Sequence, residues 1–231
     1  MEESFHGRGF GSVSVTGHKA YQEAYEPLVP GVKFAKLNDL DSVKALVTDR
    51  TCAIIVEPVQ GEGGINVATE EFMKGIRKIC DENDILMICD EVQCGMGRTG
   101  SFFAWQEYGV RPDIMTMAKA IGSGFPVGAF AMTEKVAEYS LAPGDHGTTY
   151  GGGPLACAAV AKTVEIFEEK HIPEHVKEIG AYLKKQLEEL AKKHDCILAC
   201  KGKGLMQGIQ LSISPAEVTK KALEKGLLLI S

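Results

Sequence analysis

Several features that mark whole classes of proteins are missing from this 231-residue sequence. No apolar run reaches the length of a membrane span, and no signal-peptide pattern is present. The 25 basic and 31 acidic residues give a formal net charge of −6, whereas nucleic-acid binders carry a basic excess. We therefore expect a soluble, cytoplasmic, globular protein with neither a membrane nor a nucleic-acid partner.

The seven cysteines are an odd number and include no C-x-x-C spacing. Four of them, Cys52, Cys80, Cys89 and Cys157, lie within apolar runs. Such cysteines are typical of small core residues in a reducing cytosol, and we expect all four to be buried. Hydrophobic residues make up 45% of the chain, which is enough for a real core.

Strand and helix patterns alternate along the first part of the chain. Apolar runs at 53–56 and 85–89 predict strands. Between them, Phe72, Ile76 and Ile79 fall at helical spacing and predict a helix over 69–83, with Thr69 as its N-cap. This order predicts a parallel α/β unit with a right-handed crossover. Residues 21–44 and 57–64 are rich in proline or glycine and predict loops, apart from a helix at 41–48.

The remainder continues this alternation. Further strands are expected at 114–118 and 127–132, and further helices at 103–108, 134–139, 155–170 and 173–194. The tail predicts strands at 196–201, 205–211 and 227–230, with a helix at 215–225, as at the start of a small α/β domain.

The stretch 86–130 holds the strongest candidate for chemistry. Its first apolar run ends at Asp90 and its second ends just before Lys119 and a Gly-Ser-Gly turn. Ligands collect at the carboxyl ends of strands in α/β sheets, so both side chains are expected to face one crevice. A lysine there can form a Schiff base with an aldehyde cofactor in a desolvated crevice, and an acid can keep a pyridine nitrogen protonated.

Each of these residues also has a simpler explanation. Asp90 alone is explained as a strand-end cap, and Lys119 alone as a solvated lysine. Four apolar residues followed by Asp-Glu are also typical of the magnesium-binding strand of a P-loop NTPase, but the required G-x-x-x-x-G-K-[ST] loop is absent. His171 and His175 stand four apart with Pro173 between them and no other ligand type nearby, so no metal site is predicted.

Six motifs together resemble those of the class III pyridoxal-phosphate aminotransferases. They occur in the family's order and span nearly the whole chain: SFHGR, EPVQGEGG, LMICDEVQCGMGRTG, MTMAKAIGSGFPVGA, HGTTYGGGPLAC and GKGLMQGI. The HGTTYGG form and the PVGAF after the lysine turn most resemble the acetylornithine group of that family. Departures from the usual family pattern are Gly9 and Cys94 in place of threonine and Gly153 in place of asparagine. We expect Cys94 to be a buried, neutral thiol.

The resemblance implies roles for individual residues toward pyridoxal 5′-phosphate. Lys119 is implied as the Schiff-base lysine and proton shuttle, and Asp90 as the partner of the pyridine nitrogen. The other implied cofactor-binding residues are Phe5 and Val92 on the two ring faces, Gln93 at the phenolic oxygen, Glu91, and Thr149 at the phosphate of a neighbouring subunit. The partner implied by Thr149 is a second copy of the chain, in a homodimer.

Substrate-binding roles follow from the same resemblance. Arg8 is implied to grip the substrate α-carboxylate as a bidentate fork, with Thr148 nearby. Glu62 is implied as the acid that lets one pocket take both an amine substrate and 2-oxoglutarate. From the residues alone, Phe5 is equally a core residue, Arg8 a surface one, and 143–154 a plain linker or a phosphate-holding loop.

The resemblance implies a fold-type I transferase with a three-layer α/β/α large domain over 1–170 and a smaller α/β domain beginning at 171–231, both incomplete. The expected reaction moves an amino group from N-acetylornithine to 2-oxoglutarate by a ping-pong route, in arginine biosynthesis. We expect the sequence to be a fragment without the family's N-terminal phosphate loop and C-terminal arginine, and to be inactive alone. The alternatives are an ornithine- or 4-aminobutyrate-type aminotransferase, an aminomutase of the same fold, and a non-catalytic remnant.

Overall fold

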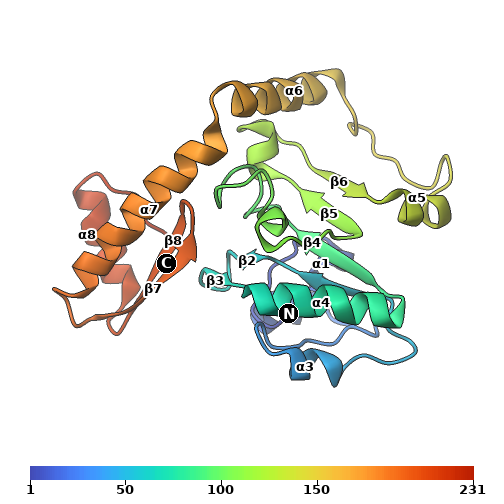
Figure 1. Cartoon of the computed structure of the whole chain (residues 1–231), viewed down its shortest axis with the longest axis horizontal. Helices are drawn as coiled ribbons and strands as arrows, with labels where there is room; N and C mark the ends of the chain where they lie inside the picture. Colours follow the sequence, from blue (N-terminus) through green and yellow to red (C-terminus); the bar gives the residue numbers. More distant parts are fainter.

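A four-stranded sheet lies at the centre of the structure, a computed structural model that describes residues 1–231. Its strands are β1 (Ala53–Val56), β4 (Leu86–Asp90), β5 (Ile114–Met117) and β6 (Ala129–Met132), in the order β1-β4-β5-β6 (Figure 1). The first three are parallel, and β6 pairs with β5 in the antiparallel direction. The predicted strands are therefore confirmed, and β6 closes one edge of the parallel part.

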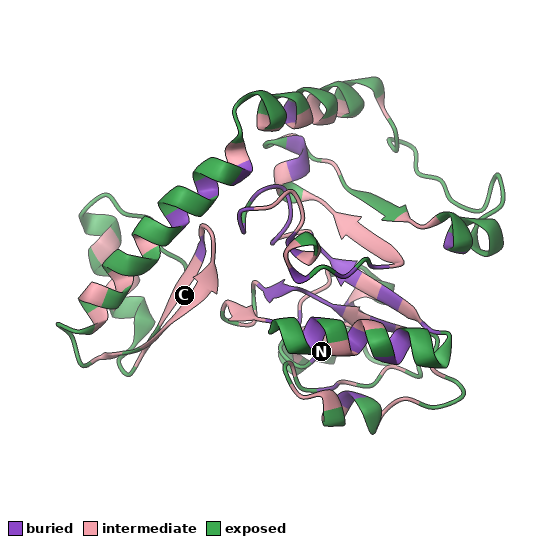
Figure 2. Ribbon diagram, viewed as in Figure 1, coloured by how far each residue is buried: buried purple, intermediate pink, exposed green.

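Helix α4 (Glu70–Asn83) connects β1 to β4 and covers one face of the sheet, as predicted. Its N-cap is Thr69, whose side chain accepts a hydrogen bond of 3.1 Å from the backbone N–H of Phe72. Phe72, Met73 and Ile76 are fully buried and belong to a core cluster that β1 and β4 complete. Figure 2 shows buried residues concentrated in this layer. The main core thus lies directly beneath the strand that ends at Asp90.

The segments predicted as loops contain short elements. Residues 10–25 form α1 (Phe10–Ser14), α2 (Lys19–Gln22) and the 3₁₀ helix η1 (Glu23–Tyr25), and residues 59–67 form a small antiparallel hairpin of β2 (Val59–Gln60) and β3 (Asn66–Val67). These elements have two to five residues, too few to repeat an apolar period. The loop prediction was therefore wrong at 21–25 and 59–60, whereas no loop was predicted at 10–20 or 66–67. Helix α3 (Leu40–Lys44) is shorter than predicted, and its N-cap is Asp39, whose side chain accepts from the N–H of Ser42.

The second half is mostly helical. Helix α5 (Glu134–Ser140) follows β6, and α6 (Pro154–Glu169) and α7 (Ile172–Ala191) lead away from the central sheet to a hairpin of β7 (Ile197–Lys203) and β8 (Met206–Leu211) and then to α8 (Pro215–Glu224) (Figure 1). A Cβ at Gly180 on α7 would lie 2.6 Å from the backbone of Gly204, and one at Gly204 would lie 2.6 Å from the backbone of Arg98. Three backbone segments therefore meet here with room only for glycine.

Two expectations for apolar residues were wrong. Residues 227–230 form no strand, and Leu228 and Ile230 are 82% and 101% exposed, because no strand of the chain pairs with them. Cys52 and Cys157 are exposed, while Cys80, Cys89 and Cys94 are buried, and all seven cysteines are free. An apolar sequence neighbourhood did not reveal which face of an element each cysteine occupies. No helix in the structure combines the length and apolar character needed to cross a membrane.

The loop that follows β4 is held by a buried acid, Glu91, which is 2% exposed. Its Oε2 accepts from the N–H of Ala104 and its Oε1 from the N–H of Trp105, both at 2.9 Å, at the start of the 3₁₀ helix η2 (Ala104–Tyr108). The Cys94 thiol donates to Oε2 at 3.4 Å. Burial raises the pKa of Glu91 to about 7, although these hydrogen bonds act in the opposite direction.

Replacing Thr69 with alanine tests the α4 cap. We expect Thr69→Ala to lower the free energy of unfolding by about 1 kcal/mol, because the N–H of Phe72 loses its acceptor. Urea unfolding of the full native protein followed by circular dichroism measures the loss. Thr219→Ala is the matched control, because this exposed hydroxyl bonds only to the carbonyl of Ala216 within α8. Equal effects of the two substitutions would contradict the capping role.

Glu91 predicts a pH-dependent stability. Because its pKa is higher in the folded state than its ordinary 4.5, the folded state binds more protons between pH 4.5 and about 7. The free energy of unfolding therefore falls as pH rises through this window, by about 3 kcal/mol. In Glu91→Gln the pH-dependent contribution disappears, while one of the amides of Ala104 and Trp105 loses its acceptor at every pH, so the variant's stability deficit relative to the parent should be smaller at pH 8 than at pH 4.5. Urea titrations at both pH values, with exposed Glu82→Gln as control, decide it; an unchanged pH slope in Glu91→Gln would refute the assignment.

Candidate functional site

Asp90 and Lys119 lie at the carboxyl ends of neighbouring parallel strands. Asp90 is the last residue of β4 and stands in register with Thr116 of β5, and Lys119 follows three residues later. The predicted placement at one sheet edge is therefore confirmed. Lys119 opens the 3₁₀ helix η3 (Lys119–Gly122) with φ of 51°, in the left-handed region that non-glycine residues seldom adopt outside functional or turn positions.

The two side chains have different surroundings. Asp90 is 6% exposed, whereas Lys119 is exposed and makes no hydrogen bond or ion pair within the chain. The expectation that Lys119 lies in a desolvated crevice is thus not met within these 231 residues. Within η3, Ile121 and Gly122 are buried whereas Lys119 is exposed.

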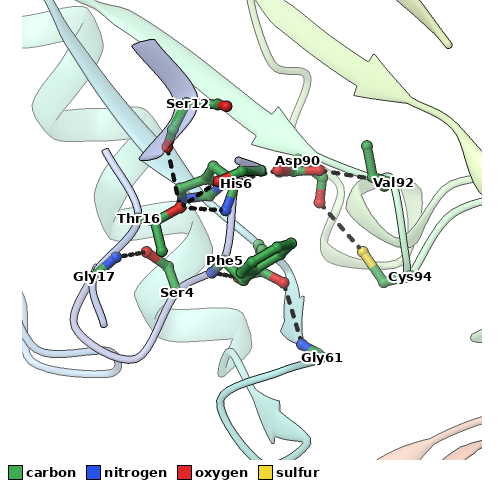
Figure 3. Close-up of polar contacts among 12 residues, drawn as sticks. Ser4, Phe5, His6, Ser12, Thr16, Gly17, Gly61, Asp90, Val92 and Cys94 are labelled. Carbon is green, nitrogen blue, oxygen red and sulfur yellow. Dashed lines mark hydrogen bonds and ion pairs between the residues drawn. The ribbon is translucent and has the colours of Figure 1, made fainter. Parts of the chain in front are cut away.

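Both carboxylate oxygens of Asp90 are already engaged. Oδ2 lies 2.7 Å from Nδ1 of His6, and Oδ1 accepts a 3.0 Å hydrogen bond from the backbone N–H of Val92 (Figure 3). Each oxygen retains a second lone-pair direction. The acid is therefore held in one orientation while it keeps the capacity to accept another N–H.

The segment Ser4–His6 is fastened to its surroundings at every residue. The N–H of Phe5 donates to Oε1 of Glu57 at 2.8 Å, and the N–H of His6 donates to Oγ1 of Thr16 at 2.9 Å. The N–H of Gly17 donates to Oγ of Ser4 at 2.9 Å (Figure 3). These bonds hold the backbone that carries the Phe5 and His6 side chains.

Glu57 links this segment to the loop after β1. It is 4% exposed, and its Oε2 accepts from the N–H of Gly61 at 3.1 Å. Burial raises the pKa of this carboxyl, and the hydrogen bonds from Phe5 and Gly61 oppose the rise. One buried side chain thus joins the SFHGR and EPVQGEGG segments, which lie 52 residues apart in the chain.

Gly61 is needed for a second reason. A Cβ at this position would lie 1.4 Å from Oε1 of Gln93, so the Gln93 side chain crosses directly over the loop. The Gln93 amide nitrogen in turn lies 3.5 Å from Oε1 of Glu62, which is exposed. Two residues named from the resemblance therefore meet at one point, through space that only glycine leaves free.

Arg8 lies over aromatic rings beside this cluster. Its guanidinium carbon is 4.8 Å from the centre of the Tyr21 ring and 5.7 Å from that of Phe5, distances typical of cation–π contacts. The Phe5 and Tyr21 rings meet edge to face at 5.4 Å. The cation is held by stacking, and its guanidinium N–H groups remain free of protein acceptors.

Three residues implied by the resemblance lie apart from this cluster or face away from it. Thr148 and Thr149 are exposed in the segment between α5 and α6, which contacts the sheet through His146 against the Phe130 ring at 5.1 Å. Glu91 turns its carboxylate toward η2 and not toward Asp90. Cys94 is 1% exposed, and burial raises the pKa of its thiol, so the predicted neutral, buried thiol is confirmed.

Sequence reasoning missed three residues of the site, His6, Glu57 and Tyr21. His6 and Glu57 stand inside the quoted motifs, but their contacts span 84 and 52 residues, and no local period reports such contacts. Tyr21 lies in a segment that was predicted to be a loop. One signal could have identified His6 and Glu57: each stands in a motif that also contains a glycine turn.

The arrangement suits an aromatic, positively charged heterocycle. A fixed carboxylate can accept its ring N–H, an aromatic side chain and Val92 can flank its plane, and a lysine amine stands at the neighbouring strand end. The histidine, cysteine, aspartate and glutamate side chains form no group of three or more that could hold a metal ion.

The sequence is similar to known aminotransferases along its whole length. It is 48% identical over 229 residues to acetylornithine aminotransferase of Methanocaldococcus jannaschii, covering 99% of this chain and 57% of that protein. It is 49% identical over 232 residues to that of Clostridium acetobutylicum, covering 100% of this chain and 60% of that protein. The chain therefore spans somewhat more than half the length of these relatives.

Solved structures of aminotransferases have the same fold as this chain. Ornithine aminotransferase from Toxoplasma gondii ME49 superposes with a TM-score of 0.93 at 30% identity, over 98% of this chain and 55% of that one. A PLP-bound amine transaminase from an uncultivated Pseudomonas species gives a TM-score of 0.91 at 30% identity, over 99% and 61%. The predicted fold-type I transferase fold is thereby confirmed. The sequence model of class III aminotransferases matches residues 1–231, and the chain belongs to that family.

Proposed function

We propose that the protein is a pyridoxal-phosphate-dependent transaminase that moves an amino group from N-acetylornithine to 2-oxoglutarate. The observation that carries this proposal is that Asp90 and Lys119 lie at the ends of adjacent parallel strands, with the Asp90 carboxylate held by His6 and the amide of Val92. The curated relatives at 48–49% identity are named acetylornithine aminotransferases, while ornithine aminotransferase is a structural neighbour at 30%. The greater similarity favours the acetylated donor.

The residues of the site fit the cofactor's pyridine ring. When bound, pyridoxal phosphate supplies an electron-accepting ring on which an amino group is carried. Asp90 would accept the pyridine N–H on a free lone pair, because His6 and the amide of Val92 leave its oxygens oriented but not saturated. Phe5 and Val92 would flank the ring, and Gln93 would reach its phenolic oxygen.

The proton that moves during the reaction is assigned to Lys119. Its amine stands on η3 at the strand end with no acid paired to it, so it is free to take and return a proton at Nζ. Arg8, held over the face of the Tyr21 ring, would bind the substrate α-carboxylate through its unbonded N–H groups. Thr148, which lies apart from Arg8 within this chain, would be a further substrate-binding residue. Glu62 would be the acid near the second substrate group.

The remaining elements of the proposal concern the assembly. We place residues 1–170 in the cofactor domain and 171–231 in the small domain, with the linking helix α7 between their two sheets. We further propose a cytoplasmic homodimer in which Thr149 contacts the partner's cofactor phosphate. The exposure of Thr149 and of its neighbour Tyr150, which is 88% exposed, supports a surface that a second copy covers.

Lys119→Ala tests the lysine. We expect the substitution in the full native protein to lower transamination by at least a thousandfold and to leave the fold intact, because the exposed side chain contributes no packing. Amino-group transfer is assayed as glutamate formation, with Lys135→Ala as the matched surface control. Borohydride reduction of the cofactor-loaded parent, followed by peptide mapping, should place the pyridoxyl label on Lys119. Finding it on another lysine would overturn the assignment.

Asp90→Asn tests the acid. The amide keeps the size of the side chain but cannot balance a pyridinium charge, so we expect retained cofactor and a loss of roughly a hundredfold or more in kcat. Asp41→Asn, an exposed acid on α3, is the control. Activity within threefold of the parent would show that Asp90 is only a strand-end cap.

A further inference from the structure

We propose that Tyr21, on helix α2, is a positioning residue that orients the Arg8 guanidinium toward the substrate carboxylate. The inference rests on the proposed function, in which Arg8 binds that carboxylate. The guanidinium carbon of Arg8 lies 4.8 Å from the centre of the Tyr21 ring, nearer than the 5.7 Å that separates it from the Phe5 ring. Arg8 is exposed and is paired with no acid of the chain, so the Tyr21 ring is the group that restrains its charged end.

This kind of contact leaves the binding edge of the arginine open. A guanidinium is planar, and its five N–H groups point outward in that plane. The π face of an aromatic ring attracts the cation without needing any of these N–H groups. A carboxylate in the same place would accept two of them and would compete with the substrate. Tyr21 therefore restrains Arg8 and leaves its bidentate edge available to a ligand.

The same ring also contacts the aromatic residue assigned to the cofactor. The Phe5 and Tyr21 rings meet edge to face at 5.4 Å with an angle of 74° between their planes, and the His18 ring lies 4.8 Å from Tyr21. The Tyr21 hydroxyl makes no hydrogen bond within the chain, so the ring alone makes these contacts. One side chain thus sets the place of Arg8 relative to Phe5, and hence of the substrate carboxylate relative to the cofactor.

The two segments that carry Tyr21 and Arg8 are joined through a buried threonine. The side-chain amide of Gln22, next to Tyr21, donates to the carbonyl of Thr16 at 3.0 Å. Thr16 is 0% exposed, and its Oγ1 accepts from the N–H of His6 at 2.9 Å, two residues before Arg8. The backbone therefore holds Tyr21 in place independently of Arg8, and the flexible arginine side chain adopts the position that the ring favours.

Phenylalanine and leucine at position 21 separate the aromatic ring from apolar volume. The probes are N-acetylornithine and N-acetylputrescine, which carries the same reactive amine without the α-carboxylate. In the full native protein loaded with pyridoxal phosphate, Tyr21→Leu should lower kcat/KM for N-acetylornithine about tenfold more than for N-acetylputrescine, mainly through KM. Tyr21→Phe keeps the ring, so its ratio between the two amines should stay within about threefold of the parent's. Tyr25→Leu, which replaces an exposed tyrosine of η1 outside the cluster, is the matched control.

A double-mutant cycle needs N-acetylornithine alone. If Tyr21 acts through Arg8, Tyr21→Leu should change kcat/KM less than about twofold in a protein that already carries Arg8→Ala. A Tyr21→Leu effect of the same size with and without Arg8 would overturn the proposal. Equal losses for the two amines in Tyr21→Leu would overturn it as well, because a ring kept only for packing would affect both alike.

A spectroscopic measurement does not depend on the folding of the Tyr21 variants. In the cofactor-free parent with ¹⁵N-labelled arginine, the Nε proton of Arg8, identified by its loss in Arg8→Ala, should resonate upfield of that of exposed Arg50, because it lies over a ring. Coincidence of the Arg8 and Arg50 resonances would overturn the proposal. A parent that binds no pyridoxal phosphate and transaminates neither amine would instead overturn the proposed function, while the Arg8 resonance would still report the ring contact.

Discussion

The parallel pairing of β4 with β5 is the constraint on which the site depends. Their register places Asp90 opposite Thr116, so the two chain segments that leave the sheet here must begin side by side. One segment starts with an acid and the other with a lysine. The strand directions themselves come from the α4 crossover, whose buried face of Phe72, Met73 and Ile76 holds β1 and β4 on one core. The burial of the apolar face of α4 thus helps to bring Asp90 and Lys119, which are 29 positions apart in the sequence, to neighbouring strand ends.

A second layer of organisation consists of buried acids that bind backbone amides. Glu57 joins the segment before α1 to the loop after β1, and Glu91 joins the end of β4 to η2. In each case one carboxylate satisfies amides that the interrupted secondary structure leaves without partners, which would otherwise cost about 1–3 kcal/mol each if buried. The loops around Asp90 are therefore irregular in shape, but these four amides, of Phe5, Gly61, Ala104 and Trp105, are bonded. This explains how side chains on loops can be held as firmly as side chains on the sheet.

Local sequence patterns predicted the parts of this arrangement that are themselves local. The strand at 53–56, the Thr69 cap, helix α4 and the placement of Asp90 and Lys119 at one edge follow from period, capping chemistry and the rule for parallel strands. The long-range contacts near Asp90 do not follow from local patterns. His6 bonds to Asp90 across 84 positions, and Glu57 bonds to Phe5 across 52. The antiparallel direction of β6 and the absence of a strand at 227–230 depend equally on which partner is present. Family resemblance identified the residues around the site but not the direction in which Glu91 points.

The three acids near the site differ in what surrounds them. Glu57 and Glu91 are enclosed by amides and apolar side chains, and burial raises the pKa of both. Asp90 alone among the three faces an imidazole, and it alone stands at the strand end from which a ligand can approach. The two glutamates spend both carboxylate oxygens on backbone amides of loops. Asp90 instead presents its carboxylate where a ligand can approach, so loop architecture and ligand contact are divided between different acids.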